Sequence, residues 1–316
     1  MRQLVSVVVP ACDEEGVIRE FHGRLAHVLS TLDHFRWEVL FVDDGSRDKT
    51  HSLLHELRES DSRVGIVQLS RNFGKEIAMT AGLDHARGDA VVVIDADLQD
   101  PPELIADFLR EWQSGFDVVY ARRTHRDGES WLKKRTADFF YRTIGRLSKV
   151  EVPANTGDYR LLSRRAVDAL LQLREHHRFM KGLFAWVGYP SKAVPYRRER
   201  RAAGASKFSY WKLWNFALEG ITSFSMLPLK LATYLGIFIA FMAFVSGAWI
   251  IARTLIWSHD VAGYPSLIVT VLFLGGVQLF FIGIIGEYVG RIYNEVKKRP
   301  LYVVQSFKPP GDNAAT

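Results

Sequence analysis

The stretch that decides the fold reads VVVIDADLQDPPE and covers residues 91–103. Its β-branched start predicts a buried strand at Ala90–Asp95, and the two prolines stop it from continuing. Asp95 and Asp97 stand two residues apart, so in a strand both side chains point toward one place just past its carboxyl end, where open α/β sheets bind ligands. Two like charges held this close repel unless a cation or proton lies between them, which indicates Mg²⁺ or Mn²⁺ carrying a phosphorylated substrate. The same residues also fit a solvated acidic turn in which Asp100 caps the next helix.

Further apolar runs precede this stretch, and each ends in a short polar cluster. Strands are expected at Leu4–Val9, Trp37–Val42 and Val64–Leu69, and helices at Val17–Leu32, Thr50–Leu57, Ile77–Leu83 and Pro102–Trp112. Because strands alternate with helical segments, we expect an α/β fold with a mostly parallel sheet and helices on both faces. The fingerprint G-x-G-x-x-G is absent after the first strand, and so is the phosphate loop G-x-x-x-x-G-K-[ST]. The expected nucleotide is therefore held by acidic residues through a metal rather than by a glycine cradle.

The charge balance indicates an anionic partner. Lys and Arg number 41 against 35 Asp and Glu, a net charge of +6, which is compatible with a nucleotide, a lipid phosphate, a membrane surface or a nucleic acid. Basic residues gather at 122–135 and at 197–201; such runs form either a solvated face or phosphate contacts, and small residues beside cations at 204–208 suit phosphate binding. The single cysteine, Cys12, excludes a disulfide framework and a cysteine-based zinc site.

The segment Asn155–Leu161 reads as a compact polar loop between an expected strand at Asp117–Ala121 and a helix at Ala166–Leu173. Within it, Asp158 is compatible with a catalytic role or with a structural one, either capping or pairing with Arg160.

Two long apolar segments near the end of the chain predict membrane spans. Leu231–Ala252 and Ser266–Gly286 carry no formal charge, and each matches the roughly 20 residues that cross a bilayer. The aromatic-rich Tyr210–Leu229 predicts a helix in the membrane interface, with a core helix as the alternative. Ser258–Pro265 has no Lys or Arg whereas both outer flanks do, which predicts two cytoplasmic flanks. No signal peptide precedes the first strand, so the N-terminal region is expected in the cytoplasm.

These patterns divide the chain into five parts. They are a cytoplasmic catalytic domain at 1–209, a juxtamembrane amphipathic helix at 210–230, transmembrane helices at 231–257 and 266–290, and a cytoplasmic tail at 291–316. Glu287 and Arg291 are expected to pair four residues apart where the second span ends. The residues from Pro309 onward are expected to be a frayed tail.

With these segments in order, the chain resembles the family-two glycosyltransferases of the GT-A fold, and more narrowly the polyisoprenyl-phosphate glycosyltransferases such as the bactoprenol glucosyltransferases. The resemblance covers nearly the whole chain. It is carried by motifs at 7–10, 42–46, 70–76, 95–103, 155–161, 206–208 and 286–293, which read VVVP, VDDGS, SRNFGKE, DADLQDPPE, NTGDYRL, SKF and GEYVGRIY.

The resemblance implies a role for each of several residues. A UDP-sugar donor is expected on Pro10, Glu14 and Asp44, of which Asp44 reads the base. Mg²⁺ or Mn²⁺ is expected on Asp97, assisted by Asp95 and Gln99. Contacts to donor or acceptor phosphates are expected from Arg123, Lys134, Arg201 and Lys207. The expected catalytic set is Asp95, Asp97, Asp158, Arg160 and Lys207. Relatives carry Tyr and Asn where this chain has Cys12 and Asp13, so stacking of that Tyr on the base cannot occur here.

The implied reaction transfers glucose from UDP-glucose to undecaprenyl phosphate, with inversion, on the cytoplasmic face of a bacterial inner membrane, in the modification of a surface polysaccharide. A lipid phosphate is already an anion, so it needs cationic positioning more than a general base. The resemblance also implies a homo-oligomer. Alternatives are another nucleotide sugar, or a non-catalytic membrane scaffold with a degenerate nucleotide fold. A processive polysaccharide synthase lacks support because the Gln-x-x-Arg-Trp motif is absent, and a nucleic-acid binder because no recognition motif is present.

Overall fold

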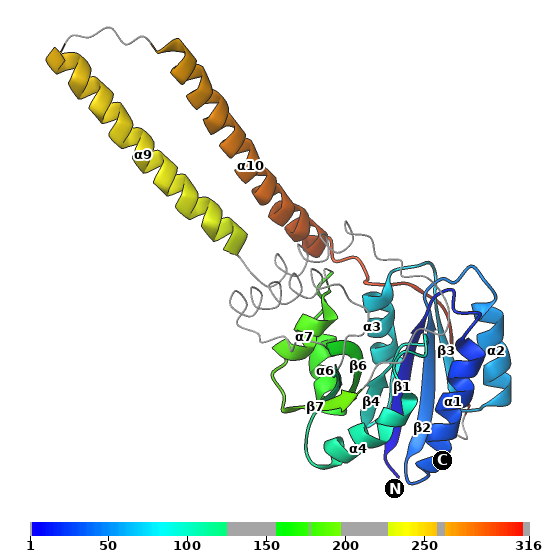
Figure 1. Cartoon of the computed structure of the whole chain (residues 1–316). Helices are drawn as coiled ribbons and strands as arrows, with labels where there is room; N and C mark the ends of the chain where they lie inside the picture. Colours follow the sequence, from blue (N-terminus) through cyan, green and yellow to red (C-terminus); the bar gives the residue numbers. More distant parts are fainter. Residues whose placement is uncertain (1, 125–155, 177, 197–226, 258–262, 312–316) are drawn as a thin grey trace. The chain divides into compact units, whose positions relative to one another are not determined.

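The computed structural model describes residues 2–124, 156–176, 178–196, 227–257 and 263–311 (Figure 1). The chain divides into two compact units. One comprises Met1–Ala217 together with Pro300–Thr316, and the other is Leu218–Arg299.

The first unit is built on a mixed sheet whose strands, among the described residues, lie in the order β7-β5-β6-β4-β1-β2-β3-β8. The strands are β1 Leu4–Ala11, β2 Arg36–Asp43, β3 Val64–Leu69, β4 Ala90–Val93, β5 Val118–Arg123, β6 Thr156–Ser163, β7 Ser191–Tyr196 and β8 Val304–Lys308. β1 pairs in parallel with β2 and β4, and β2 with β3, so the carboxyl ends of these four strands share one edge. β6 is antiparallel to β4 and β5, and β8 is antiparallel to β3.

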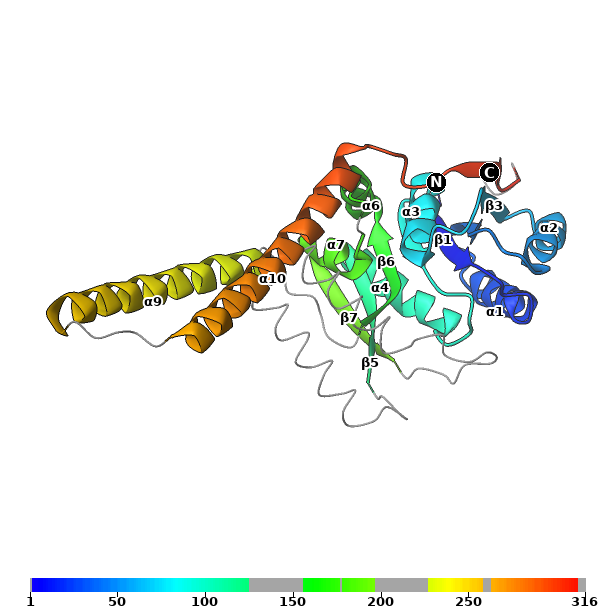
Figure 2. The ribbon, with the colours of Figure 1, turned by 90° about the horizontal axis from the view of Figure 1, so that it is seen from above.

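Helices cover both faces of the sheet, as predicted (Figure 2). One face carries α1 Ile18–Thr31, α2 Thr50–Ser60 and, after the short 3₁₀ helix η1 Pro102–Leu104, α4 Ile105–Gln113; the other carries α3 Lys75–His85, α6 Arg164–Gln172 and α7 Met180–Trp186. Alternate β1 residues face the two layers, since Val5, Val7 and Val9 join the core under α1 while Val8 faces α3. A side chain on Gly82 of α3 would collide with Val8, so glycine is required where α3 approaches β1.

Two predicted features of this unit are wrong. β4 ends at Val93 rather than at Asp95, so both carboxylates lie just past the strand instead of on it. From Thr156 onward, the expected polar loop at Asn155–Leu161 is instead part of β6, a central strand paired on both sides. The polar residues of this segment indicate a loop in the sequence, but the sheet buries one of them, since Arg160 is only 4% exposed.

The expected frayed tail is also wrong for Pro309–Gly311. β8 follows the second long helix and covers the edge of β3, which would otherwise present unpaired backbone groups. Pro310 is buried and packs where Gly65 leaves room, and the Gly311 amide donates to the Ser62 carbonyl at 2.8 Å. The end of the described chain is therefore part of the first unit.

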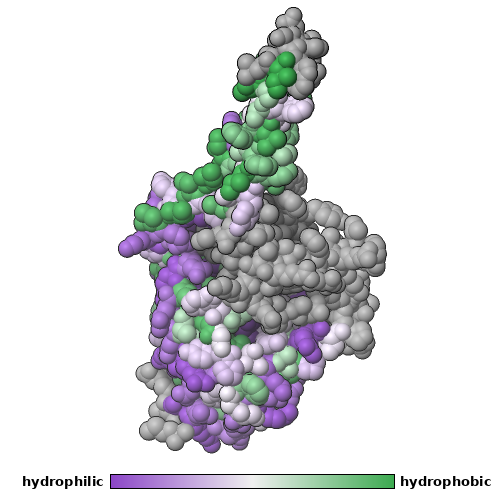
Figure 3. Space-filling view, turned by 90° about the vertical axis from the view of Figure 1, so that its left-hand side faces the viewer, coloured by the Kyte–Doolittle hydropathy of each residue, from purple (hydrophilic) through white to green (hydrophobic). Residues whose placement is uncertain are grey.

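The second unit contains two long apolar helices, α9 Leu227–Trp257 and α10 Tyr264–Val296. Within them, Ala232–Ala252 and Ser266–Val296 are long and apolar enough to cross a membrane, and their side chains are not buried inside the protein. Figure 3 shows hydrophobic residues along this hairpin, in contrast to the largely hydrophilic surface of the sheet unit. The predicted pair is confirmed, since Arg291 Nε donates to Glu287 Oε1 at 3.0 Å. Most of the predicted interfacial helix at 210–230 lies outside the described residues.

Candidate active site

Three loops follow the carboxyl ends of β1, β2 and β3, and hydrogen bonds join the first two. The Arg47 amide donates to Asp13 Oδ1 and the Glu14 amide donates to Thr50 Oγ1, both at 2.8 Å. Asp13 has φ 56°, in the left-handed region where Asn and Asp are better tolerated than other side chains. The Asp at this position therefore keeps the backbone shape that Asn allows and also caps the second loop.

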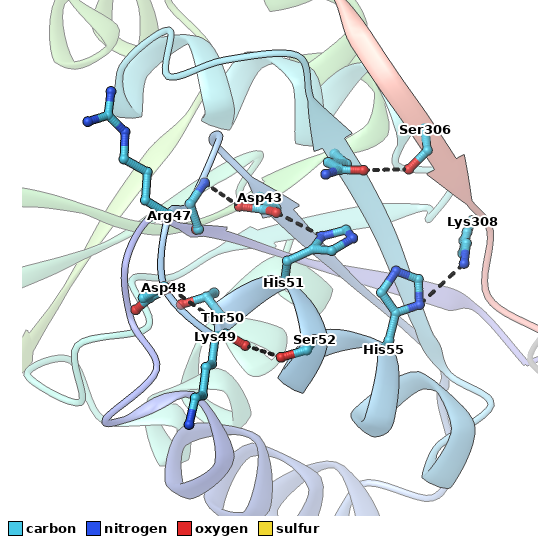
Figure 4. A network of polar contacts seen from close by, with 12 residues as sticks. Asp43, Arg47, Asp48, Lys49, Thr50, His51, Ser52, His55, Ser306 and Lys308 are labelled. Atoms are coloured by element: carbon cyan, nitrogen blue, oxygen red, sulfur yellow. Dashed lines mark hydrogen bonds and ion pairs between the residues drawn. The ribbon is translucent and has the colours of Figure 1, made fainter.

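The second loop is held by Asp43, the last residue of β2, as Figure 4 shows. Asp43 Oδ1 accepts the Ser46 amide at 2.9 Å, and Oδ2 lies 3.0 Å from Nδ1 of His51 in α2. Further along α2, His55 Nδ1 lies 3.3 Å from Lys308 Nζ of β8 (Figure 4). Burial and the charge of Lys308 lower the pKa of His55. A polar network thus connects the loop after β2 with the C-terminal strand.

Asp44 joins the second loop to the third. Its two carboxylate oxygens accept the amides of Phe73 and Gly74 at 2.7 and 2.9 Å. Burial raises the pKa of Asp44 despite these hydrogen bonds. Cys12 also reaches the third loop, since Asn72 Nδ2 donates to its Sγ at 3.1 Å. The residues predicted to bind the donor therefore lie at one edge of the sheet. Pro10 is near the end of β1, and Glu14 and Asp44 are on the connected loops after β1 and β2.

The predicted metal ligands lie just past β4 and share one side of the chain. Asp95, Asp97 and Gln99 are partly exposed, whereas Ala96, Leu98 and Asp100 between them are buried. The Gln99 amide donates to Asp97 Oδ1 at 3.1 Å, and Leu98 takes a left-handed φ of 60°. Partly exposed and buried side chains thus alternate from Asp95 to Asp100, as they would in a strand, although β4 has ended.

This oxygen set fits Mg²⁺ or Mn²⁺ in part. Two carboxylates and an amide oxygen are hard ligands, and such ions commonly take their remaining ligands from phosphates and water. Across the ranges that the structure covers, no three His, Cys, Asp or Glu side chains are close enough to hold a metal together. Asp95 and Asp97 would thus supply the protein's carboxylate ligands.

Lys75, at the start of α3, brings two of the predicted residues together. Its Nζ lies 2.7 Å from Asp95 Oδ2 and 2.7 Å from Asp158 Oδ2. Burial alone would lower the pKa of Lys75, but the charges of the two carboxylates outweigh it and raise this pKa. Burial would raise the pKa of Asp158, but Lys75 and then Lys181 lower it, so Asp158 stays ionised. The motif at 70–76 was recognised in the sequence, but no role was assigned to Lys75.

Arg160 lies beside this cluster and does not use the Asp158 carboxylate as its hydrogen-bond acceptor. Arg160 Nη2 donates to the Gly157 carbonyl at 2.8 Å and Nε to the Asp158 backbone carbonyl at 3.3 Å. Its guanidinium carbon lies 3.7 Å from the ring centre of Phe184 in α7. Burial lowers the pKa of Arg160 to about 10, which leaves it a cation at neutral pH. The Asp158 carboxylate therefore pairs with Lys75 and not, as the structural alternative had predicted, with the Arg160 guanidinium.

Glu76 connects the start of α7 to the cluster of Lys75, Asp95 and Asp158. Its Oε2 accepts the Met180 amide at 3.1 Å. Burial and then the charge of Asp158 raise the pKa of Glu76 to about 8, against the opposing charge of Lys75. As with Lys75, the sequence motif at 70–76 includes Glu76, in the first turn of α3, but no role was assigned to it.

Asp100 does not cap a helix, so the alternative of a capped acidic turn is wrong. It accepts a hydrogen bond from the Tyr196 hydroxyl, and η1 begins after Pro101 without a side-chain cap. Arg123 donates to the same Tyr196 hydroxyl at 3.3 Å, and its Nη2 would lie 3.2 Å from a Cβ at Gly157. Arg123 is thus adjacent to the segment that carries Asp158. The other predicted phosphate contacts, Lys134, Arg201 and Lys207, lie outside the described residues.

Comparison with known proteins assigns this arrangement to a family. The profile described as "Glycosyl transferase family 2" matches residues 6–171, and that described as "GtrB C-terminal hairpin" matches residues 227–292. The chain belongs to glycosyl transferase family 2. It is therefore a glycosyltransferase with a GT-A fold, and the family predicted by resemblance is confirmed.

Relatives of this family match almost the whole chain. A bactoprenol glucosyl transferase derived from prophage SfII in Shigella flexneri is 48% identical over 301 residues, 95% of this chain and 97% of the relative. A glycosyltransferase of Synechocystis sp. is 52% identical over 300 residues, 95% and 94% of the two chains. Among solved structures, a mannosyltransferase from Pyrobaculum calidifontis in complex with GDP-Man and Mn²⁺ is 18% identical with a TM-score of 0.49, over 93% of this chain and 88% of that one.

Proposed function

We propose that this glycosyltransferase moves glucose from UDP-glucose to a polyprenyl phosphate such as undecaprenyl phosphate and releases UDP. The observation that carries the proposal is the cluster at the end of β4, where carboxylates predicted to bind a metal lie next to buried and half-buried cations. The nearly full-length similarity to a bactoprenol glucosyl transferase supports the sugar and the lipid.

The donor would lie along the three loops after β1, β2 and β3. Asp44 is the candidate for reading the base, because a carboxylate oxygen that accepts one backbone amide can accept a second donor. With Mg²⁺ or Mn²⁺ bound, Asp95, Asp97 and Gln99 would hold it, and the ion would supply positive charge to the diphosphate that leaves. Asp158 Oδ1 is buried and has no hydrogen-bond partner in the described part of the chain, which suits it to accept a sugar hydroxyl.

The acceptor phosphate would be positioned by cations, because it is an anion that must approach the anionic donor. Arg160 and Arg123 both approach Gly157 and would supply part of this charge. The remainder is proposed for Lys134, Arg201 and Lys207. Direct attack of a phosphate oxygen on the anomeric carbon forms the new bond as the bond to UDP breaks, which inverts the configuration at that carbon.

The second unit would place the enzyme in a membrane. We propose that α9 and α10 both cross a bacterial inner membrane, with the sheet unit and both chain termini in the cytoplasm. The absence of Lys and Arg between the helices and their presence on both outer flanks support this orientation. We also propose that the protein forms a homo-oligomer and that its product is used in modifying a surface polysaccharide.

The experiment is transfer of radiolabelled sugar from a panel of UDP-sugars to undecaprenyl phosphate with Mg²⁺, Mn²⁺ or EDTA, followed by organic extraction. Label should enter the organic phase from UDP-glucose and be lost with EDTA. Label from a different UDP-sugar would keep the acceptor and overturn the sugar. Activity that persists in EDTA would refute the metal, and no label from any donor with a series of polyprenyl phosphates would favour the non-catalytic scaffold.

A further inference from the structure

Lys75 lies between the carboxylates of Asp95 and Asp158, which would repel each other without a cation. One ammonium group lies 2.7 Å from an oxygen of each carboxylate, so it offsets the repulsion between them. Asp95 is also one of the two carboxylates predicted to bind the metal. The same carboxylate therefore has two possible cationic partners, one built into α3 and one supplied from solution.

The two cations compete. An ammonium in contact with Asp95 repels a divalent ion at that carboxylate and also uses one of its oxygens as a hydrogen-bond acceptor. The Lys75 side chain is 44% exposed and unbranched, so it can turn toward another anion without unpacking the core. A donor diphosphate is such an anion, and it also supplies oxygen ligands to the metal.

We propose that Lys75 is a positioning residue whose ammonium group binds both Asp95 and Asp158 in the free protein. When a divalent metal binds together with a nucleotide diphosphate, Lys75 releases Asp95 and the metal takes its place at that carboxylate. This inference rests on the proposed function, in which the donor is UDP-glucose. Asp158 is held in place by Lys75 before the donor binds, and metal binding depends on the nucleotide. Because coupling between two ligands is reciprocal, the metal strengthens nucleotide binding by the same factor.

The test measures Mn²⁺ binding by electron paramagnetic resonance on the full-length protein in detergent, with and without saturating UDP and corrected for Mn²⁺ held by free UDP. In the unmodified protein, UDP should lower the Kd for Mn²⁺ about tenfold or more. In Lys75→Met, the Kd without UDP should be about tenfold lower than in the unmodified protein, and the further effect of UDP should be smaller.

Two variants serve as controls. Lys75→Arg keeps the positive charge and should keep weak binding of Mn²⁺ in the absence of UDP. Lys192→Met removes the same charge from the exposed surface of β7 and should leave the Kd unchanged. Circular dichroism and gel filtration check that each variant is folded, and Lys75→Ala replaces Lys75→Met if the latter is not.

The outcomes separate this inference from the proposed function. A Kd in Lys75→Met that equals or exceeds that of the unmodified protein without nucleotide would overturn the role of Lys75, whatever UDP does. If GDP strengthens Mn²⁺ binding and UDP does not, the proposed donor is wrong, whereas tighter Mn²⁺ binding by Lys75→Met without nucleotide would still support the role of Lys75.

Discussion

Glu76 offers a sharp test of the electrostatics beneath the active site. The change is Glu76→Gln, which keeps the shape of the side chain and an oxygen that can accept the Met180 amide. It prevents the side chain from gaining a negative charge near Asp158 as pH rises. In the folded protein, burial and Asp158 raise the pKa of Glu76 from 4.5 to about 8. The folded state therefore keeps a proton on Glu76 at pH values where the unfolded chain has lost it.

The sign of the effect follows from this difference. Below about pH 4.5 the group is protonated in both states, and its contribution to stability is fully present. As pH rises toward 8, Glu76 ionises first in the unfolded state, and the free energy of unfolding falls. Above pH 8 Glu76 is ionised in both states, and the loss is complete. Each pKa unit corresponds to 1.36 kcal/mol, so the shift from 4.5 to about 8 predicts a loss of up to about 5 kcal/mol.

The assay is unfolding of the full-length protein in detergent between pH 4 and 9, for the unmodified protein and for Glu76→Gln. The difference in unfolding free energy between the two removes the contribution of titrating groups that do not interact with Glu76. The variant should gain relative stability as pH rises from 4.5 to 8 and none beyond. Glu20→Gln, on the exposed surface of α1, should give a flat difference. A flat difference for Glu76→Gln as well would refute the reasoning.

Three further changes test the site and its support. Asp97→Ala should lower transfer at least about 100-fold, measured by extraction of lipid-linked label, with an unchanged melting temperature; persistent activity would remove the metal assignment. Gly45→Ala places a Cβ at φ 67° about 2.5 Å from the backbone of the third loop, so the Kd for UDP should rise about tenfold by calorimetry; Gly23→Ala, which meets no atom within 4 Å, should leave it unchanged. Arg87→Met leaves the buried carboxylate of Glu38 without its guanidinium partner, whose side chain is 54% exposed, and should cost roughly 1–3 kcal/mol of unfolding free energy; a loss under about 0.5 kcal/mol would mean that Ser6 and the backbone amide of residue 87 satisfy it alone.

Much of the fold is predictable from the sequence because its strands are continuous apolar runs. Val64–Leu69 is found with the predicted bounds, and the helix after it begins within two residues of the prediction. β6 could not be predicted in this way, because a strand whose polar residues find partners inside the protein has no apolar pattern. β8 is short and mostly exposed, so its pairing with β3 depends on an edge that the local sequence does not reveal.

The candidate site is predictable in type but not in its contacts. Asp95 and Asp158 were recognised from their motifs, but 20 and 83 residues separate them from Lys75, and only the folded chain shows that one ammonium joins them. Asp44 was predicted to read a base, yet its carboxylate also holds the third loop through two backbone amides. Motifs therefore identify which residues matter, whereas long-range packing decides which of them act together.

The third loop connects the two ends of the expected donor. Its residues Phe73 and Gly74 are held by Asp44, the proposed base-reading residue, and the next residue, Lys75, contacts Asp95 and Asp158, which are proposed to face the metal and the sugar. Only one peptide unit separates these two sets of contacts, so a shift of the loop when a base meets Asp44 must also move the backbone that carries Lys75. If Asp44 reads the base as proposed, this adjacency would link nucleotide binding to the cation next to the predicted metal ligands without a movement of the sheet.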